Sequence, residues 1–222
     1  GDYYAKYPTV TVAGNHEMKG DWNFVSFAQR FNMSGAKTGY PQFDRTMGYF
    51  EYGDAIFVIL NGEVTPADKK PEIMKKELQW CKSVLDASDK KWRIVMTHTG
   101  PYTSNHDPLD VRDYYINDSE YSLDKMNVDL FLNGHDHIYI RSTVKNDIKV
   151  NTGDGTTYLT GGTVGNKFYE YIPARSDYST DFYVDEEDKQ VFSVIEFSED
   201  SIKGTAYQKQ DPDDWNSFKA VD

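Results

Sequence analysis

The chain has 222 residues, a net charge of −12, and 38% hydrophobic and 27% charged residues. These proportions are those of a globular protein and exclude a disordered, collagen-like or coiled-coil chain. The acidic charge argues against a nucleic-acid partner and against docking to anionic membranes, because both need a basic surface. The single cysteine, Cys81, excludes a disulfide framework and a thiolate metal cluster.

Short apolar runs alternate with helical patterns along the chain, which predicts an α/β layer architecture. A buried strand is predicted over residues 9–13, followed by a helix that Asp21 caps and that carries an apolar stripe as far as Phe31. Two short runs at 49–52 and 55–60 flank a Gly-Asp turn and predict a hairpin. The second of them is the longest apolar run and is far too short to span a membrane.

The middle and the end of the chain continue this alternation. Pro71 suits the first turn of a helix that is predicted to end near Asp86, and Cys81 falls on its buried stripe. A short helix is also predicted over residues 119–126. Further strands are predicted over residues 92–97, 129–132, 138–144, 156–160, 191–197 and 202–208.

Two long polar segments are predicted to be irregular. Residues 99–118 show little regular pattern, and residues 169–188 are acidic and rich in tyrosine. Loops of this length are uncommon in compact domains and are often functional. Residues 209–222 are predicted to form an acidic tail or the start of a linker.

Four of the five histidines follow predicted strands directly. They are His16, His98, His135 and His137. Pockets in open α/β sheets form outside the carboxyl ends of the strands, so strands that deliver polar groups there predict one shared site. The alternative is a scattered set of surface or capped histidines. That alternative is favoured for any single histidine but not for this pattern.

The spacing of these residues suits metal binding. In an extended chain residues i and i+2 share a face about 7 Å apart, so His135 and His137 can serve two metal ions about 3.5–4 Å apart. Neutral imidazole suits Zn, Fe, Ni or Cu, whereas the amide oxygen of Asn15 suits a harder ion. Gly14 and Gly134 let the chain turn sharply and approach a metal closely.

Three motifs in this order resemble those of the calcineurin-like metallophosphoesterases. They are Gly14-Asn15-His16-Glu17, Val95-Met96-Thr97-His98 and Gly134-His135-Asp136-His137. The continuation over residues 138–142 looks like the purple acid phosphatase branch. The resemblance covers residues 9 to about 162, and it implies an α/β fold in which a β-sandwich is flanked by helices, with its first strands missing from this chain.

The resemblance also implies a site with two divalent or trivalent metal ions, for which Fe, Zn or Mn are expected. The ligands of one ion would be Asn15, His98 and His135. His137 would bind the other ion. Such a pair of ions hydrolyses phosphate monoesters in enzymes of this kind, and the expected partner is a small phosphorylated substrate.

The remaining histidines take substrate roles under the same resemblance. His16 would contact the phosphate or protonate the leaving group. His106 matches the place of a second substrate-binding histidine, with a plain surface histidine as the alternative. Glu17 and Asp136 are expected to lie behind the ligands, where acidic groups orient metal-bound imidazoles.

The family motifs that supply carboxylate ligands, and the tyrosine ligand of the purple branch, have no counterpart before Asn15. Gly1-Asp2 mimics one of them, but Ala5 stands where the tyrosine would be. Residues 1–208 are therefore expected to be the C-terminal portion of a catalytic domain that binds at most one metal ion well and is nearly inactive alone. Exposed sheet edges then predict pairing with the N-terminal portion or self-association.

Two other functions remain open at this point. One is a phosphodiesterase or nucleotidase of the same superfamily. The other is a non-catalytic surface binding module on the same fold, with which the acidic, tyrosine-rich segment 169–188 is compatible. Similar enzymes are often secreted or attached to the cell surface, so that location is expected by family tendency.

Overall fold

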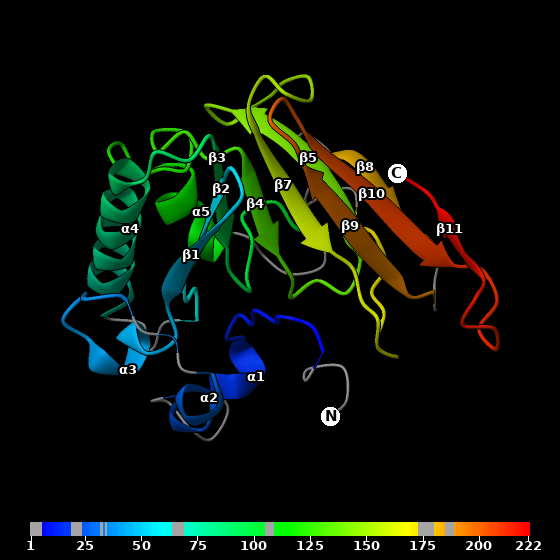
Figure 1. The fold of residues 1–222 in the computed structure, drawn as a ribbon, viewed down its shortest axis with the longest axis horizontal. Helices are drawn as coiled ribbons and strands as arrows, with labels where there is room; N and C mark the ends of the chain where they lie inside the picture. The colour runs from blue at the N-terminus through cyan, green and yellow to red at the C-terminus, as the bar shows by residue number, and fades with distance from the viewer. Residues whose placement is uncertain are drawn as a thin grey trace.

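A computed structural model describes residues 6–18, 24–31, 33, 35–63, 69–104, 109–172, 180–184 and 189–222. Within this part of the chain, eight strands form one mixed sheet and three strands form a second sheet (Figure 1). Helices lie against the face of the large sheet that the second sheet leaves uncovered. The architecture confirms the predicted α/β fold with a β-sandwich flanked by helices.

The large sheet has the strand order β1-β2-β3-β4-β7-β5-β6, with β8 also paired to β5. Its strands are β1 (Gly48–Tyr52), β2 (Ala55–Ile59), β3 (Trp92–Met96), β4 (Leu130–Asn133), β5 (Tyr139–Lys145), β6 (Ile148–Lys149), β7 (Thr156–Gly161) and β8 (Thr180–Val184). β1 and β2 form the predicted hairpin, with Tyr52 opposite Ala55. Strands β2, β3, β4 and β7 run parallel, so their carboxyl ends meet at one edge of the sheet.

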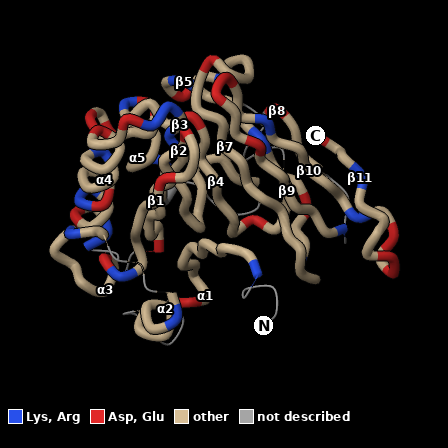
Figure 2. The backbone as a smooth tube through the Cα atoms, in the orientation of Figure 1, with Lys and Arg blue, Asp and Glu red and all other residues tan. Residues whose placement is uncertain are grey.

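Helix α4 (Lys70–Ala87) covers one face of the large sheet together with α5 (Leu109–Tyr115). The stripe predicted for α4 is fully buried and consists of Met74, Leu78, Cys81 and Leu85. Basic and acidic residues alternate on the rest of α4 (Figure 2). No helix in the described part of the chain is long and apolar enough to cross a lipid bilayer.

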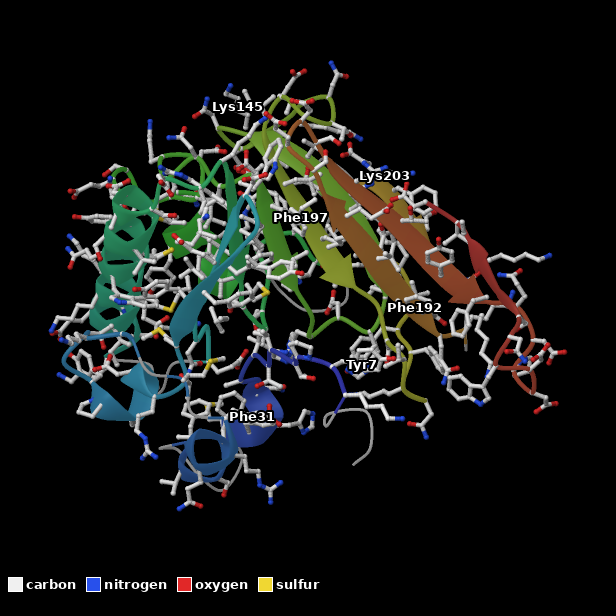
Figure 3. All side chains as sticks on the ribbon, in the orientation of Figure 1. Tyr7, Phe31, Lys145, Phe192, Phe197 and Lys203 are labelled. Carbon is white, nitrogen blue, oxygen red and sulfur yellow. The ribbon has the colours of Figure 1, made fainter. Side chains whose placement is uncertain are left out.

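The second sheet packs on the opposite face and consists of β9 (Val191–Phe197), β10 (Ile202–Lys209) and β11 (Phe218–Ala220). Between the sheets, Phe197 meets Phe57 edge to face with ring centroids 5.4 Å apart (Figure 3). Leu130, Leu159 and Ala206 complete this apolar layer. Both faces of the parallel strands are therefore covered, which explains their nearly continuous apolar sequences.

The strand predicted over residues 9–13 does not form. These residues have no strand partner among the described residues, and Val10 is 44% exposed. The apolar run instead crosses the end of the sheet and buries only its last residue, Ala13, before the short helix α1 (Asn15–Met18). Tyr7 and Phe31 are partly exposed at this same end of the molecule (Figure 3).

The helix predicted from Asp21 is shorter than expected. The described helix α2 (Val25–Arg30) begins after Phe24, which has a left-handed backbone with φ 52°, and it buries Phe27 and Ala28. Asp21 lies outside the described residues. A one-turn helix, α3 (Pro41–Asp44), follows before β1.

Two predictions for the chain between β3 and β4 were wrong: residues 99–118 were expected to be irregular, and residues 119–126 were expected to form a helix. The segment 99–118 contains α5, because the pair Val111 and Tyr115 buries one face of that helix. Residues 119–126 form turns instead of a helix. There the Asp118 carboxylate accepts the N–H groups of Glu120 and Tyr121 at 2.8 and 2.7 Å, and such local bonds compete with helix formation.

Two other segments are more ordered than their composition predicts. The predicted loop 169–188 contains β8, which pairs with β5 at the edge of the large sheet. The predicted tail 209–222 contains β11, and the Asp222 carboxylate binds Arg141 Nε at 2.7 Å and the Tyr139 hydroxyl at 2.9 Å. The acidic turn before β11 lies far from α4 (Figure 2).

Candidate metal centre

The ends of β3 and β4 place the two main histidine motifs side by side. The N–H of Thr97 donates to Leu132 O at 3.1 Å, and the N–H of Gly134 donates to His98 O at 2.9 Å. These bonds continue the parallel pairing beyond the strands, as far as His98 after β3 and Gly134 after β4. Both chains therefore leave the sheet together, as the carboxyl-end argument predicts.

Asn15, His98 and His135 converge at this edge of the sheet. His98 Nε2 lies 3.1 Å from Asn15 Oδ1 and 3.1 Å from His135 Nδ1. The two imidazole rings meet edge to face with centroids 5.0 Å apart. Helix α1, which carries Asn15, lies at the ends of the parallel strands (Figure 1), so residues far apart in sequence share one cluster.

Glycines make this close approach possible. A Cβ on Gly14 would lie 3.0 Å from three atoms of the His98 ring, so the ring packs directly on the Gly14 backbone. The Glu17 carboxylate accepts the Gly14 N–H at 2.9 Å and fixes the turn into α1. Glu17 therefore supports the turn that leads to Asn15.

His137 is held by a different part of the chain. Its Nδ1 lies 2.8 Å from Lys167 O, and its ring stacks on Tyr169 with centroids 4.7 Å apart and an interplanar angle of 17°. Because a backbone carbonyl can only accept, Nδ1 is the donor in this contact, and Nε2 is the ring nitrogen left to face a metal ion. This is the orientation that metal-binding imidazoles usually have.

The extended geometry expected between His135 and His137 is absent. Residues 135–138 form a bend, and His135 has a left-handed backbone with φ 68°. Strand β5 begins only at Tyr139. The simple face-sharing argument for i and i+2 therefore does not apply to this motif.

Asp136 ties three loops together beneath the cluster. Its side chain is fully buried, and its Oδ2 accepts the Ser104 N–H at 2.7 Å. The Ser104 hydroxyl in turn accepts the N–H of Ile172 at 2.5 Å. Asp136 thus connects the histidine bend to the segment after β3 and to the segment that holds His137.

Asn133 and Gly100 also shape the site, although neither was predicted from the sequence to do so. Asn133 is buried and donates to Gly134 O at 3.1 Å and to Thr160 Oγ1 at 3.0 Å. A Cβ on Gly100 would lie 2.3 Å from the Asn133 side chain, so only glycine fits there. The Gly100-Pro101 pair after His98 and the Asn133-Gly134 pair were visible signals of tight packing at the two strand ends.

Of the two histidines that are expected to contact the substrate, one lies within the described residues. His16 is exposed on α1, next to Asn15. His106 lies outside the described residues.

The calcineurin-like phosphoesterase family model matches residues 1–139, well over half of the chain. The chain belongs to this family. The matched region includes the whole cluster of Asn15, His98 and His135, together with His137.

Two purple acid phosphatases are similar to this chain, one in sequence and one in structure. Purple acid phosphatase 18 of Arabidopsis thaliana is 28% identical over 173 residues, which cover 72% of this chain and 36% of that protein. The structure of purple acid phosphatase PPD1 from yellow lupin seeds has a TM-score of 0.55 at 15% identity and covers 91% of this chain and 34% of that chain. This chain thus spans about a third of the length of either phosphatase.

A second similar structure is GAP50, the anchor in the inner membrane complex of Plasmodium. Its TM-score is 0.61 at 17% identity, and the alignment covers 97% of this chain and 66% of that chain. At these identities both solved structures show a shared fold and nothing more. The fold itself therefore occurs both in a phosphatase and in an anchor protein.

The cluster brings together atoms of the kinds that bind metal ions. Two imidazole nitrogens and one amide oxygen converge, and their 3.1 Å separations are close to the roughly 3.3 Å between ligand atoms around a tetrahedral Zn²⁺. The described residues contain no group of three or more His, Cys, Asp or Glu side chains that could hold a metal ion. The donor set fits one ion through Asn15, His98 and His135, and it includes no carboxylate that would bridge a second.

Proposed function

We propose that this chain carries the histidine-rich half of a metal-dependent phosphomonoesterase site. The convergence of Asn15 Oδ1, His98 Nε2 and His135 Nδ1 carries the proposal. Imidazole nitrogens and amide oxygens are common ligands of metal ions, so their convergence supports a bound cation. The similarity to purple acid phosphatases supports phosphate esters as the substrate class.

The residues of the candidate site would have different roles in the reaction. Bound metal ions would supply the positive charge that draws in the phosphate and would acidify an attacking water. Asn15, His98 and His135 would hold one ion, and His137 would present Nε2 to a second. His16, exposed next to Asn15, would contact the phosphate or give a proton to the leaving oxygen.

We also infer that the 222-residue chain turns over slowly by itself. Its described residues place no carboxylate among the ligands, and two cations a few ångströms apart repel each other strongly without one. Tight binding of a single ion is the expected state. Pairing with a further portion of the protein or self-association, and a secreted or surface location, belong to the same proposal.

The test is hydrolysis of an aryl phosphate with added Zn²⁺, Mn²⁺ or Fe³⁺, using this chain and any longer natural form that contains it. His98→Ala is expected to abolish the activity of the longer form, and the wild-type chain alone is expected to be far slower. Equal rates for wild type and His98→Ala would refute the catalytic proposal. Comparison of monoester, diester and nucleotide substrates separates a phosphodiesterase or nucleotidase from a phosphomonoesterase.

A non-catalytic binding module is the second candidate. Two observations favour it: the fold is shared with an anchor protein, and the described residues lack carboxylate metal ligands. A binding module of this kind would not need the histidine cluster for its function. It predicts no metal binding by the wild-type chain, so a calorimetric titration with Zn²⁺ distinguishes it from the phosphatase proposal.

A further inference from the structure

A group of buried polar atoms without hydrogen-bond partners lies behind the strand end that carries His98. It comprises both carboxyl oxygens of Glu77 on α4, the hydroxyl of Thr97 after β3 and the hydroxyl of Tyr115 at the end of α5. Glu77 and Tyr115 are fully buried, and Thr97 is 2% exposed. Buried polar atoms are nearly always satisfied in native proteins, so three such side chains together require an explanation.

Two of these side chains, Thr97 and Tyr115, lie close to each other, and Glu77 acts on Tyr115 electrostatically. A Cβ on Gly62, just after β2, would lie 2.9 Å from Thr97 Oγ1 and 3.2 Å from Tyr115 Oη, so both hydroxyls face the same stretch of backbone. Burial raises the pKa of Tyr115, and the neighbouring Glu77 carboxyl raises it further. Glu77 therefore lies within electrostatic reach of the pair of hydroxyls.

The surroundings of Glu77 favour its neutral form. Burial raises the pKa of its carboxyl well above the usual range, and the Asp44 carboxylate acts in the same direction. The Asn61 N–H opposes this effect without overcoming it. A neutral carboxyl is a donor and an acceptor at once, so it can join two hydroxyls in one chain of hydrogen bonds.

We propose that Glu77 is a positioning residue for His98. As a neutral acid it links the Thr97 and Tyr115 hydroxyls into one buried hydrogen-bond cluster through a buried water. The connection to the site is short, because Thr97 precedes His98 and its own N–H is already bonded to Leu132 O on the next strand. The end of β3 is thus held in two ways: by the buried cluster with Glu77 on α4, and by the backbone hydrogen bond to the neighbouring strand β4.

The test compares Glu77→Gln, which keeps a donor and an acceptor, with Glu77→Leu, which keeps only the bulk. Leu85→Ala is the matched control, since Leu85 is a fully buried residue two turns further along α4. The readouts are Zn²⁺ affinity by calorimetry and the imidazole NMR signals of His98, assigned with His98→Ala. Glu77→Leu is expected to lower the affinity about tenfold and to shift or broaden the His98 signals.

Glu77→Gln is expected to stay within about twofold of wild type in Zn²⁺ affinity and to keep the His98 signals, because it rescues the hydrogen bonds. Leu85→Ala is expected to destabilise the fold while leaving both readouts in place. The proposal is overturned if Glu77→Leu leaves the His98 signals and the affinity unchanged, or if Leu85→Ala perturbs them as much as Glu77→Leu does.

A pH series provides an independent readout that needs no metal. The folded protein holds a proton on Glu77 at pH values where the unfolded chain, with a pKa of about 4.5, has lost it. Wild type is therefore expected to lose stability relative to Glu77→Gln as the pH rises above about 4.5 and until it passes the folded pKa. Urea unfolding at pH 4, 5, 6 and 7 measures this difference, and a difference that does not change with pH contradicts a neutral Glu77.

The role of His98 as a ligand rests on the proposed function, and the two proposals can fail separately. If wild type binds no Zn²⁺, the metal site fails, but the NMR signals of His98 and the pH series still decide the role of Glu77.

Discussion

Two halves of the candidate site, only two residues apart in sequence, are built in different ways. His135 belongs to a converged cluster with His98 and Asn15, in which the donor atoms lie 3.1 Å apart. His137 instead donates to Lys167 O and stacks on Tyr169. The two imidazoles have different partners, so the first half depends on β3 and α1 and the second depends on the segment after β7.

This difference means that the halves can be disrupted one at a time. We propose that the first half binds an ion by itself, because His98 Nε2 lies 3.1 Å from both Asn15 Oδ1 and His135 Nδ1. The second half offers one imidazole that is oriented by its hydrogen bond but has no further donor among the described contacts. Substitutions in one half should therefore leave the other largely intact.

Removal of the central ligand should have the largest effect. His98→Ala is expected to lower Zn²⁺ affinity by at least about 100-fold, because losses of outer partners alone cost about 10–100-fold. His137→Ala is the matched control and should stay within about threefold of wild type. Calorimetry checks both variants, and equal losses for both would remove the distinction between the halves.

Gly100→Ala should be the next most damaging change. Its Cβ would lie 2.3 Å from the buried side chain of Asn133, which holds Gly134 and Thr160. Overpacking of this kind costs about 1–3 kcal/mol in the free energy of unfolding. Gly204→Ala on β10, where a Cβ meets nothing within 4 Å, should change it by less than about 0.5 kcal/mol. Urea unfolding of both variants measures the contrast, and a neutral Gly100→Ala would contradict the packing described here.

Gly14→Ala should affect the site more than the fold. The new Cβ would lie 3.0 Å from the His98 ring and would push it away from Asn15 and His135. An approximately tenfold loss of Zn²⁺ affinity is expected, as for a displaced supporting partner. The urea midpoint should change little, and an unchanged affinity would show that the ring position is not critical.

Tyr169→Ala should have the smallest effect and should act on the second half alone. Loss of the stacked ring is expected to cost about 0.5–1.5 kcal/mol in the free energy of unfolding and to mix the tautomers of His137. Tyr169→Phe keeps the ring and should behave as wild type. Nitrogen NMR of the His137 imidazole reports the tautomer, and identical spectra for the Ala variant would argue against stacking as the orienting contact.

The regular core was predictable from sequence because its signals are local. The buried stripe of α4, the β1-β2 hairpin and the apolar runs of β3 and β4 each follow from periodicity. The run at 9–13 misled the prediction because an apolar pentapeptide fits a strand equally well whether or not a partner strand lies beside it. The helix predicted over residues 119–126 does not form, because the Asp118 carboxylate accepts two backbone N–H groups at the start of this segment.

The candidate site was predictable in its residues but not in its geometry. The three motifs place Asn15, His98 and His135 at strand ends, where the structure brings them together. The contacts of His137 with Lys167 and Tyr169 join residues about 30 positions apart through an irregular segment, and periodicity carries no information about such contacts. The burial of Glu77 was not predictable either, because a charged residue in an amphipathic helix is normally expected on the solvent-exposed face.

The central claim is that Asn15, His98 and His135 bind one metal ion together. The most direct measurement is a crystal structure of the chain with Zn²⁺, scanned for anomalous signal at the zinc edge. The account predicts one ion, with Asn15 Oδ1, His98 Nε2 and His135 Nδ1 at about 2.0–2.2 Å from it. A zinc peak elsewhere, or no peak at this cluster at millimolar Zn²⁺, would contradict it.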